Sequence, residues 1–109
     1  MFKKQNRLPS LRINAKNQTF DTSLFKIKIF STGGEVLRFA FVVSKKIDKR
    51  AVVRNKTKRV LKKAAKRFLE KIAGGKDVVI FAKTKIEPAD ENIIAEALEQ
   101  VFKKAKIIK

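Results

Sequence analysis

The sequence predicts a single α+β domain over residues 1–109, because the apolar pattern changes its period along the chain. Two segments in the first half alternate with the period of two that is typical of half-buried strands. A long segment then repeats every three to four residues, as an amphipathic helix does. A short apolar strand and a second helical segment follow. With 109 residues the chain has room for one hydrophobic core, so we expect one domain.

Two alternating segments predict the first strands. Residues 24–30 place Phe25, Ile27 and Ile29 on one face and Lys26, Lys28 and Phe30 on the other. Residues 37–43 alternate in the same way, with one face made of Leu37, Phe39, Phe41 and Val43. Gly33 and Gly34 stand between the two segments, and such a glycine pair predicts a hairpin.

A long amphipathic helix is predicted from Asp48, which is expected to cap its N-terminus, to the glycine pair Gly74-Gly75, which is expected to end it. Its apolar stripe consists of Val53, Thr57, Val60, Leu61, Ala64, Phe68 and Ile72. At 100° per residue, the opposite face is centred on Asn55, Arg59, Lys62 and Lys66.

The C-terminal part predicts one more strand and one more helix. Residues 77–82 form a continuous apolar run, which indicates a strand buried on both faces that pairs in parallel after the helical crossover. Pro88 suits the first turn of the last helix. The apolar stripe of that helix consists of Ile93, Ile94, Ala97, Leu98, Val101 and Phe102.

The charge of the chain points to a polyanionic partner. Lys and Arg number 28 against 10 Asp and Glu, so the formal net charge is +18. The excess is densest in residues 45–67, where 12 of 23 residues are basic and Asp48 is the only acid. A basic stripe of this density is typical of nucleic-acid binding. A merely solvated helix face is the weaker interpretation, because solvation would tolerate mixed signs.

The composition also excludes several classes of function. The chain has no Cys and no His, so it has no disulfide, thiolate nucleophile, imidazole base or zinc ribbon. No apolar run approaches the ~20 residues that a bilayer requires, so we expect a soluble, cytoplasmic protein with no membrane partner. Two-metal hydrolysis of a phosphodiester needs clustered carboxylates. The basic region offers only Asp48, so we expect no catalytic residue and no metal site in this chain.

One motif is specific enough to indicate a family. Val43-Ser44-Lys45-Lys46 ends a predicted strand, and Ala51-Val52-Val53-Arg54-Asn55, Lys58-Arg59 and Leu61 follow in the predicted helix. In this order the residues resemble the bacterial ribonuclease P protein subunit. Lys56 and Lys62 stand where that family usually has Arg, and Lys63 where it usually has Glu. Arg7-Leu8 and Asp77-Val78-Val79 are similar to further segments of the family.

The resemblance implies a fold and an RNA-binding surface. The fold would be a two-layer α+β domain with a mixed four-stranded sheet, a basic crossover helix and a C-terminal helix, similar to ribosomal protein S5 domain 2. The crossover would be left-handed, and the fourth strand would come from a different division of residues 35–46. The candidate RNA-binding residues, taken from this resemblance and from the exposed side of the basic helix, are Lys45, Lys46, Arg50, Arg54, Asn55, Lys56, Lys58, Arg59, Lys62 and Lys66. For Asn55 and for the Lys45-Lys46 pair, the residues alone also allow an ordinary solvated surface.

The resemblance also implies a division of labour. In such enzymes a catalytic RNA binds Mg²⁺ and removes the 5′ leader of precursor tRNA, while the protein subunit binds that RNA and contacts the leader in a sheet cleft. The expected partners are therefore the RNA subunit and precursor tRNA, with no obligate protein partner and with Mg²⁺ held mainly by the RNA. The candidate leader contacts are Phe20, Lys26, Lys28 and Phe30. Packing under the N-terminal segment is an equally good interpretation of Phe30.

Two other functions explain the charge. A small ribosomal or ribosome-assembly protein would be equally basic, but that interpretation does not explain the order of the motif between Val43 and Lys62. A duplex-DNA architectural protein would be expected to show an apolar wedge or a minor-groove arm. Only the short basic N-terminus could serve as such an arm.

Overall fold

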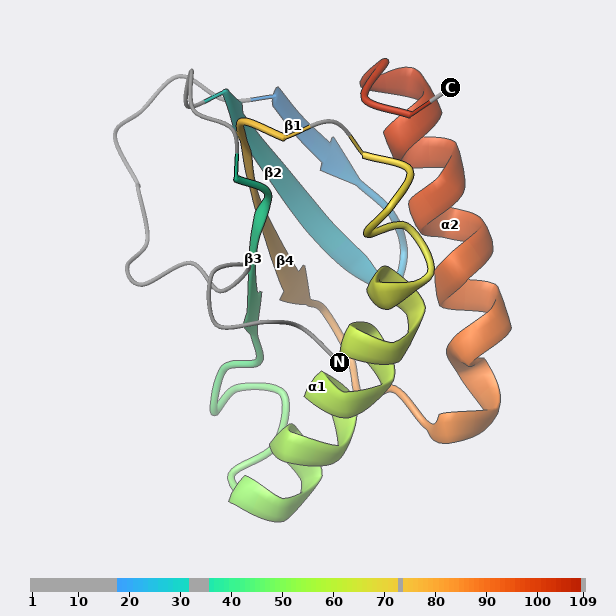
Figure 1. The fold of residues 1–109 in the computed structure, drawn as a ribbon. Helices are drawn as coiled ribbons and strands as arrows, with labels where there is room; N and C mark the ends of the chain where they lie inside the picture. Colours follow the sequence, from blue (N-terminus) through green and yellow to red (C-terminus); the bar gives the residue numbers. More distant parts are fainter. Residues whose placement is uncertain (1–17, 32–35, 73, 109) are drawn as a thin grey trace.

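The computed structural model describes residues 18–31, 36–72 and 74–108, and it shows two helices packed on a four-stranded sheet (Figure 1). The strands are β1 (Gln18–Asp21), β2 (Phe25–Ser31), β3 (Arg38–Val42) and β4 (Lys76–Ala82). Helix α1 (Ala51–Lys66) connects β3 to β4. A 3₁₀ turn (Pro88–Asp90) leads into helix α2 (Glu91–Lys104). In the described part of the chain, no helix is long and apolar enough to span a membrane.

The sheet has the order β1-β2-β4-β3, with β4 antiparallel to β2 and parallel to β3. The predicted parallel pairing after the helical crossover is therefore confirmed. The predicted hairpin between the two alternating strands is wrong, because β4 lies between β2 and β3. The apolar run of β4 is buried on both faces, and β4 pairs with β2 along one edge and with β3 along the other. Gly33 and Gly34 lie outside the described residues.

The fourth strand comes from residues before β2 and not from a division of residues 35–46. Gln18–Asp21 pairs antiparallel with β2 across a tight turn. In that turn the Thr22 hydroxyl accepts hydrogen bonds from the backbone N–H groups of Leu24 and Phe25, at 3.2 and 3.0 Å. The strand was missed because it is short and three of its four residues are polar, so it has no apolar pattern. Pro9-Ser10 also predicts a short helical turn through Leu11 and Ile13, and these residues lie outside the described ones.

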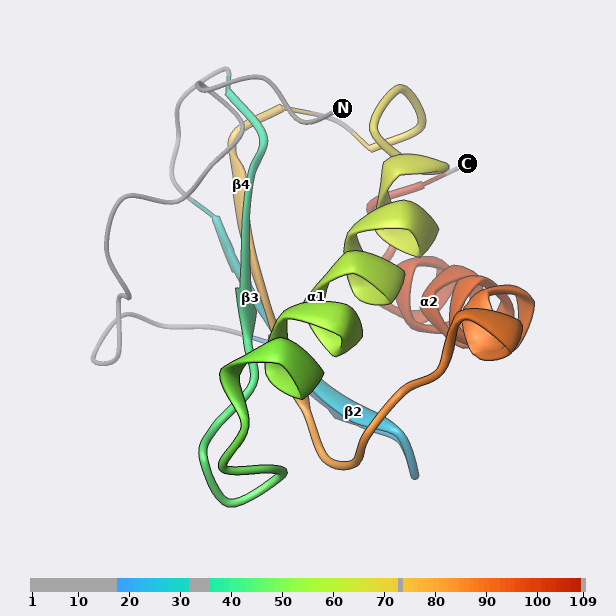
Figure 2. The ribbon, with the colours of Figure 1, turned by 90° about the horizontal axis from the view of Figure 1, so that it is seen from below.

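Both helices lie on the same side of the sheet, which makes two layers (Figure 2). The core between the layers is built from the inward faces of β2 and β4 and from the apolar stripes of α1 and α2, as the pattern predicted. Its most buried large side chains include Phe25, Ile27, Leu61, Ile80 and Phe102. Phe68 and Phe102 meet edge to face with their ring centroids 5.3 Å apart, which joins the turns after α1 to α2.

Both predicted ends of the first helix are wrong. Arg50 and not Asp48 is the N-cap residue, because Asp48 accepts a hydrogen bond from the Arg50 backbone N–H and so closes the turn before the helix. The helix ends at Lys66, and residues 67–72 continue in single turns that still bury Phe68 and Ile72. Gly75 does not end the helix but directly precedes β4. Its backbone has φ 81°, where glycine is favoured, and its N–H donates to the Val36 carbonyl at 3.1 Å.

The apolar stripe of α2 is rotated slightly from the predicted one. Ile94, Leu98, Val101 and Phe102 are buried as expected. Ile93 is 55% exposed, and Ala95 takes its place in the core. Adjacent residues are 100° apart on a helix, so the buried stripe can include Ile94 together with either Ile93 or Ala95, and the sequence alone does not choose between the two.

Candidate nucleic-acid interface

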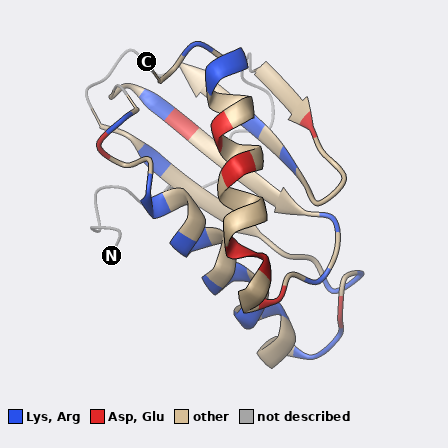
Figure 3. Cartoon of the chain, turned by 90° about the vertical axis from the view of Figure 1, so that its right-hand side faces the viewer, with Lys and Arg blue, Asp and Glu red and all other residues tan. Residues whose placement is uncertain are grey.

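The solvent-facing side of α1 presents a rigid row of polar and basic side chains. Asn55, Arg59, Lys62 and Lys66, which we call the basic helix face, are all exposed, as the helical period predicted. The residues on the other side of the helix, including Leu61 and Ala64, are buried in the core. Within the described residues, the side chains of Arg59, Lys62 and Lys66 make no hydrogen bond or ion pair. Figure 3 shows these basic positions along α1, beside the acidic positions of α2.

Arg54 is on the same helix but has a different environment. Its guanidinium donates from Nη1 to the carbonyl oxygens of Asp48 and Lys49, at 3.2 and 2.8 Å. These bonds tie the first turn of α1 to the loop that carries Lys45 and Lys46. Arg54 thus stabilises the shape of the loop, and only its remaining donors are available to a ligand.

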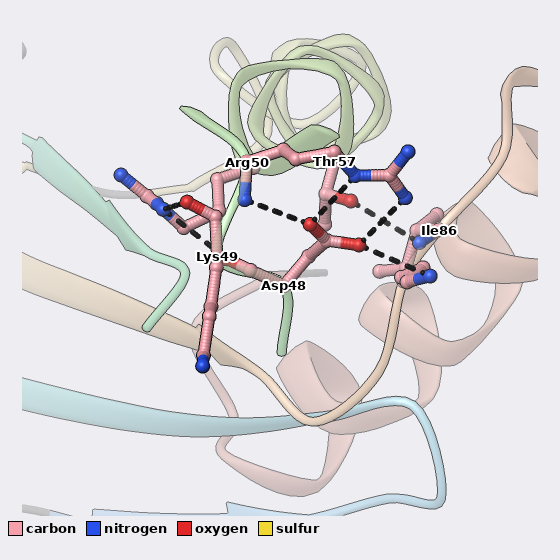
Figure 4. A network of polar contacts seen from close by, with 7 residues as sticks. Asp48, Lys49, Arg50, Thr57 and Ile86 are labelled. Atoms are coloured by element: carbon pink, nitrogen blue, oxygen red, sulfur yellow. Dashed lines mark hydrogen bonds and ion pairs between the residues drawn. The ribbon is translucent and has the colours of Figure 1, made fainter. Parts of the chain in front are cut away.

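Asp48 is the centre of a polar network that holds this loop (Figure 4). Its carboxylate accepts hydrogen bonds from the Arg50 backbone N–H at 2.8 Å and from the Arg50 side chain at 3.1 and 3.0 Å. Lys85 Nζ lies 3.1 Å from the same carboxylate and connects the loop to the segment after β4. The Arg50 hydrogen bonds, followed by that of Lys85, hold the pKa of Asp48 well below its usual range. The same contact raises the pKa of Arg50.

The remaining predicted RNA contacts surround the basic helix face. Lys45 and Lys46 are exposed in the turn after β3, and Lys58 is half-buried on the flank of α1. The side chain of Arg50 is 71% exposed although it binds Asp48. Lys56 is also exposed, but its Nζ lies 3.3 Å from the Glu87 carboxylate. The ten predicted residues therefore lie in the loop before α1 and along the whole length of the helix, and three of them (Arg50, Arg54 and Lys56) already have partners in the protein.

The predicted leader contacts do not share one face. Lys26, Lys28 and Phe30 alternate on the side of β2 that points away from the helices, whereas Phe20 pairs with Ile27 and packs against the core on the helix side. The structure therefore does not bring Phe20 together with the other three. Phe30 is only 2% exposed.

An aromatic residue that the sequence reasoning missed lies beside Lys28. This residue is Phe81, on the neighbouring strand β4. The Lys28 Nζ atom lies 5.8 Å from the centroid of the Phe81 ring. Phe81 is half-buried. Its place in a continuous apolar run concealed it, because such a run gives no sign of which residues face which side.

Two polar pairs fix the elements around the site, and the sequence pattern predicted neither. Asp77 is fully buried and accepts two hydrogen bonds from the Arg38 guanidinium, at 2.8 and 2.9 Å, where β3 and β4 are in register. Thr57 lies in the apolar stripe of α1, and its buried hydroxyl accepts a hydrogen bond from the Ile86 N–H at 3.3 Å. The stripe thus carries one polar group whose role is to attach the segment before α2.

The described residues contain no group of three or more acidic side chains that could hold a metal ion. Several of the described acidic groups pair with cations: Asp48 with Arg50 and Lys85, Glu87 with Lys56, and Glu91 with Arg67.

The fold and the site define a class of protein: a small two-layer α+β domain whose crossover helix presents an exposed row of cations beside a cation-rich loop. The family model for ribonuclease P matches residues 2–106, and the chain belongs to this family. It is therefore a protein component of a ribonucleoprotein endoribonuclease that serves tRNA processing, and its partner is the RNA subunit of that enzyme.

Relatives and solved structures agree with this assignment. The chain is 32% identical over 96 residues to the ribonuclease P protein component of Caldanaerobacter subterraneus subsp. tengcongensis, covering 88% of this chain and 82% of the relative. It is 28% identical to the component of a Pseudanabaena species, covering 99% and 97%. Among solved structures, a Staphylococcus aureus RNase P protein superposes with a TM-score of 0.69 at 27% identity, over 100% of this chain and 96% of that one. The predicted family and fold class are thereby confirmed.

Proposed function

We propose that the basic helix face and the loop before it bind the RNA subunit, and that the assembled enzyme removes the 5′ leader of precursor tRNA. The observation that carries this proposal is the set of exposed cations on α1 that have no partner among the described residues. Buried side chains on the other side of the helix hold these cations at fixed spacing. Phosphates of a folded RNA can therefore be bound with little further loss of backbone freedom.

The binding would be driven by counterion release. Each phosphate that a Lys or Arg neutralises frees condensed cations, so affinity falls steeply as salt is raised. Asn55 adds a side chain that can both donate and accept a hydrogen bond, and it can reach a ribose hydroxyl, a phosphate or a base edge. Lys56 and Lys62 supply point charges in place of the planar forks that Arg would supply.

We propose that hydrolysis is performed by the RNA subunit in the cytoplasm, and that Mg²⁺ is bound mainly by that RNA. Mg²⁺ would supply the activated water and the charge stabilisation that phosphodiester hydrolysis needs. The contribution of this chain would be to hold the RNA and to extend the surface that meets the substrate.

For the leader of precursor tRNA, we propose contact with the sheet face that carries Lys26 and Lys28. Positive charge on this face can follow a single-stranded backbone, and the half-buried ring of Phe81 beside Lys28 offers a surface on which a base can stack. Phe30 would support this face by packing, because only 2% of it is exposed.

Reconstitution tests the function directly. The chain is mixed with its cognate RNA subunit and precursor tRNA at low Mg²⁺, and cleavage is compared with that by the RNA alone. We expect faster cleavage at one site, and we expect Lys28→Ala to weaken binding of precursor tRNA while sparing mature tRNA, which has no leader. An unchanged cleavage rate, together with sedimentation of the protein with ribosomal particles, would instead favour the ribosomal alternative.

A further inference from the structure

A groove lies between α1 and the start of α2, next to the basic helix face. It has a volume of about 450 Å³, within the ~300–1,000 Å³ typical of small-ligand sites. Three apolar residues line it: Val52 and Val60 from α1 and Pro88 from the 3₁₀ turn. Its cationic lining comes from α1 alone and consists of Lys56, Arg59 and Lys63.

Four interactions join the two walls of the groove. Lys56 pairs with Glu87 at 3.3 Å, ahead of the 3₁₀ turn. Arg67 pairs with Glu91 and also donates to the Asn92 side chain at 2.9 Å. The buried bond between Thr57 and the Ile86 N–H anchors the segment that precedes Pro88. Glu91 also lines the groove, but its carboxylate is already paired with Arg67, which lowers its repulsion of an anionic ligand.

Val52 is the feature of the groove that the fold does not explain. It is 78% exposed, the most exposed of the large hydrophobic residues in the described part of the chain. It stands at the start of a helix whose other exposed residues are almost all polar or basic. An exposed apolar side chain beside cations matches a ligand that has both an apolar face and a negative charge. A nucleotide has this combination, in its base and its phosphate.

We propose that this groove binds one unpaired nucleotide of the RNA subunit. Its base lies against Val52 and Pro88, its edge hydrogen-bonds with the Asn55 amide, and its phosphate is neutralised by Arg59 and Lys63. The inference rests on the proposed RNA binding and adds to it a site that selects an unstacked base. A paired base would not fit, because its face is covered by its neighbours in the helix.

The first test separates apolar contact from charge. Val52→Thr keeps the size, the branching and nearly the helix propensity of the side chain while making it polar. We expect Val52→Thr to weaken binding of the cognate RNA subunit roughly three- to tenfold, the loss that follows from replacing one buried methyl group by a hydroxyl. The slope of log affinity against log salt should stay at its wild-type value, because no phosphate contact is lost. Ile93→Thr is the matched control: Ile93 is also exposed but does not line the groove, and its replacement should leave affinity unchanged.

The second test locates the nucleotide. Base-specific chemical probing of the RNA subunit should show one unpaired base that the wild-type protein and Ile93→Thr protect and that Val52→Thr leaves reactive. The inference is overturned if Val52→Thr binds like Ile93→Thr, if its salt slope falls, or if the pattern of base protection is the same for all three proteins. Failure of the wild-type protein to bind the RNA at all would instead overturn the proposed function, so the two failures are distinguishable.

Discussion

Arg54 and Arg59 carry the same charge on the same helix, but the structure gives them different roles. Arg54 donates to two loop carbonyls, whereas Arg59 is exposed and has no partner among the described residues. The helical period alone places both off the apolar stripe and predicts that either can be replaced without loss of stability. Only the loop geometry shows that Arg54 also supports the fold.

Replacement of the two arginines should separate binding from stability. Arg59→Ala is expected to weaken RNA binding and to reduce the magnitude of the log–log salt slope by roughly 0.7 to 0.9, the share of one phosphate contact. Its melting temperature should stay near the wild-type value. Arg54→Ala should in addition lower the free energy of unfolding by about 1 to 2 kcal/mol, because two loop carbonyls lose their donor. Salt titrations of RNA binding and denaturant unfolding measure the two effects, and equal stability of both variants would contradict the role given to Arg54.

Asp48 predicts a pH dependence of stability. Its pKa is lowered in the folded protein by the Arg50 hydrogen bonds, so its contribution to stability is present above the unfolded pKa of about 4 and is lost as pH falls toward the folded value. Asp48→Asn removes the charge and should lower the melting temperature at neutral pH. The difference from wild type should shrink as pH is lowered from about 5 to about 2. Thermal melts across this range provide the measurement, and a difference that is independent of pH would show that the carboxylate charge is not responsible.

At the scale of elements, turns and helix ends decide details that periodicity leaves open. Helix α2 ends in a Schellman motif, in which the Ile107 N–H donates to the Phe102 carbonyl and the Lys106 N–H to the Lys103 carbonyl, both at 3.1 Å. The residue that must adopt the left-handed conformation is Lys106, with φ 59°. Glycine usually occupies this position because a Cβ atom is disfavoured there.

Lys106→Gly should therefore stabilise the protein. The left-handed backbone would no longer oppose a Cβ atom, and we expect a gain of up to about 1 kcal/mol in the free energy of unfolding. The control is Lys104→Gly, which places the same residue inside the last helical turn and should destabilise by about 0.5 to 1 kcal/mol. Denaturant unfolding of the three proteins gives the comparison. Destabilisation by both substitutions would show that the Lys106 side chain contributes more than its backbone strain costs.

At the scale of the whole molecule, the excess charge that suits RNA works against folding. The chain has a formal net charge of +18, and its basic residues are densest on and around α1. The acidic groups at the start of α2 offset part of this charge through the Lys56–Glu87 and Arg67–Glu91 pairs. The cations of the basic helix face have no such pairs within the described residues, so their mutual repulsion remains until a polyanion binds.

Reversal of one charge on the basic helix face should raise the stability of the fold and weaken RNA binding. In Lys62→Glu the new carboxylate lies one helical turn from both Lys58 and Lys66, so we expect the free energy of unfolding to rise by about 0.5 to 1 kcal/mol at low salt. The gain should fade as added salt screens the charges. Binding of the RNA subunit should weaken at the same time. Melting curves and RNA titrations at two salt concentrations measure both effects, and a variant that is less stable at low salt would contradict the proposed repulsion.

The sequence by itself determined the two helices, three of the four strands, the exposed side of α1 and the family. These features depend on local periodicity and on a motif of adjacent residues, which are visible without any distant contact. The basic helix face is one example, because a helix that buries Leu61 and Ala64 must expose Arg59 and Lys62.

Only the tertiary structure decided which strands are neighbours and which charges remain available to a ligand. The strand β4 lies between β2 and β3, because the centre of the sheet buries both of its apolar faces and gives both of its edges a hydrogen-bonded neighbour. The residues at Gly33-Gly34 do not predict this strand order. The register of β1 with β2 likewise places Phe20 and Lys28 on opposite faces of the sheet.

The groove beside Val52 exists because Thr57 and Lys56 hold a segment from far along the chain against α1. Strand order, register and grooves between helices depend on contacts between distant residues, and the sequence pattern records only what each residue prefers locally.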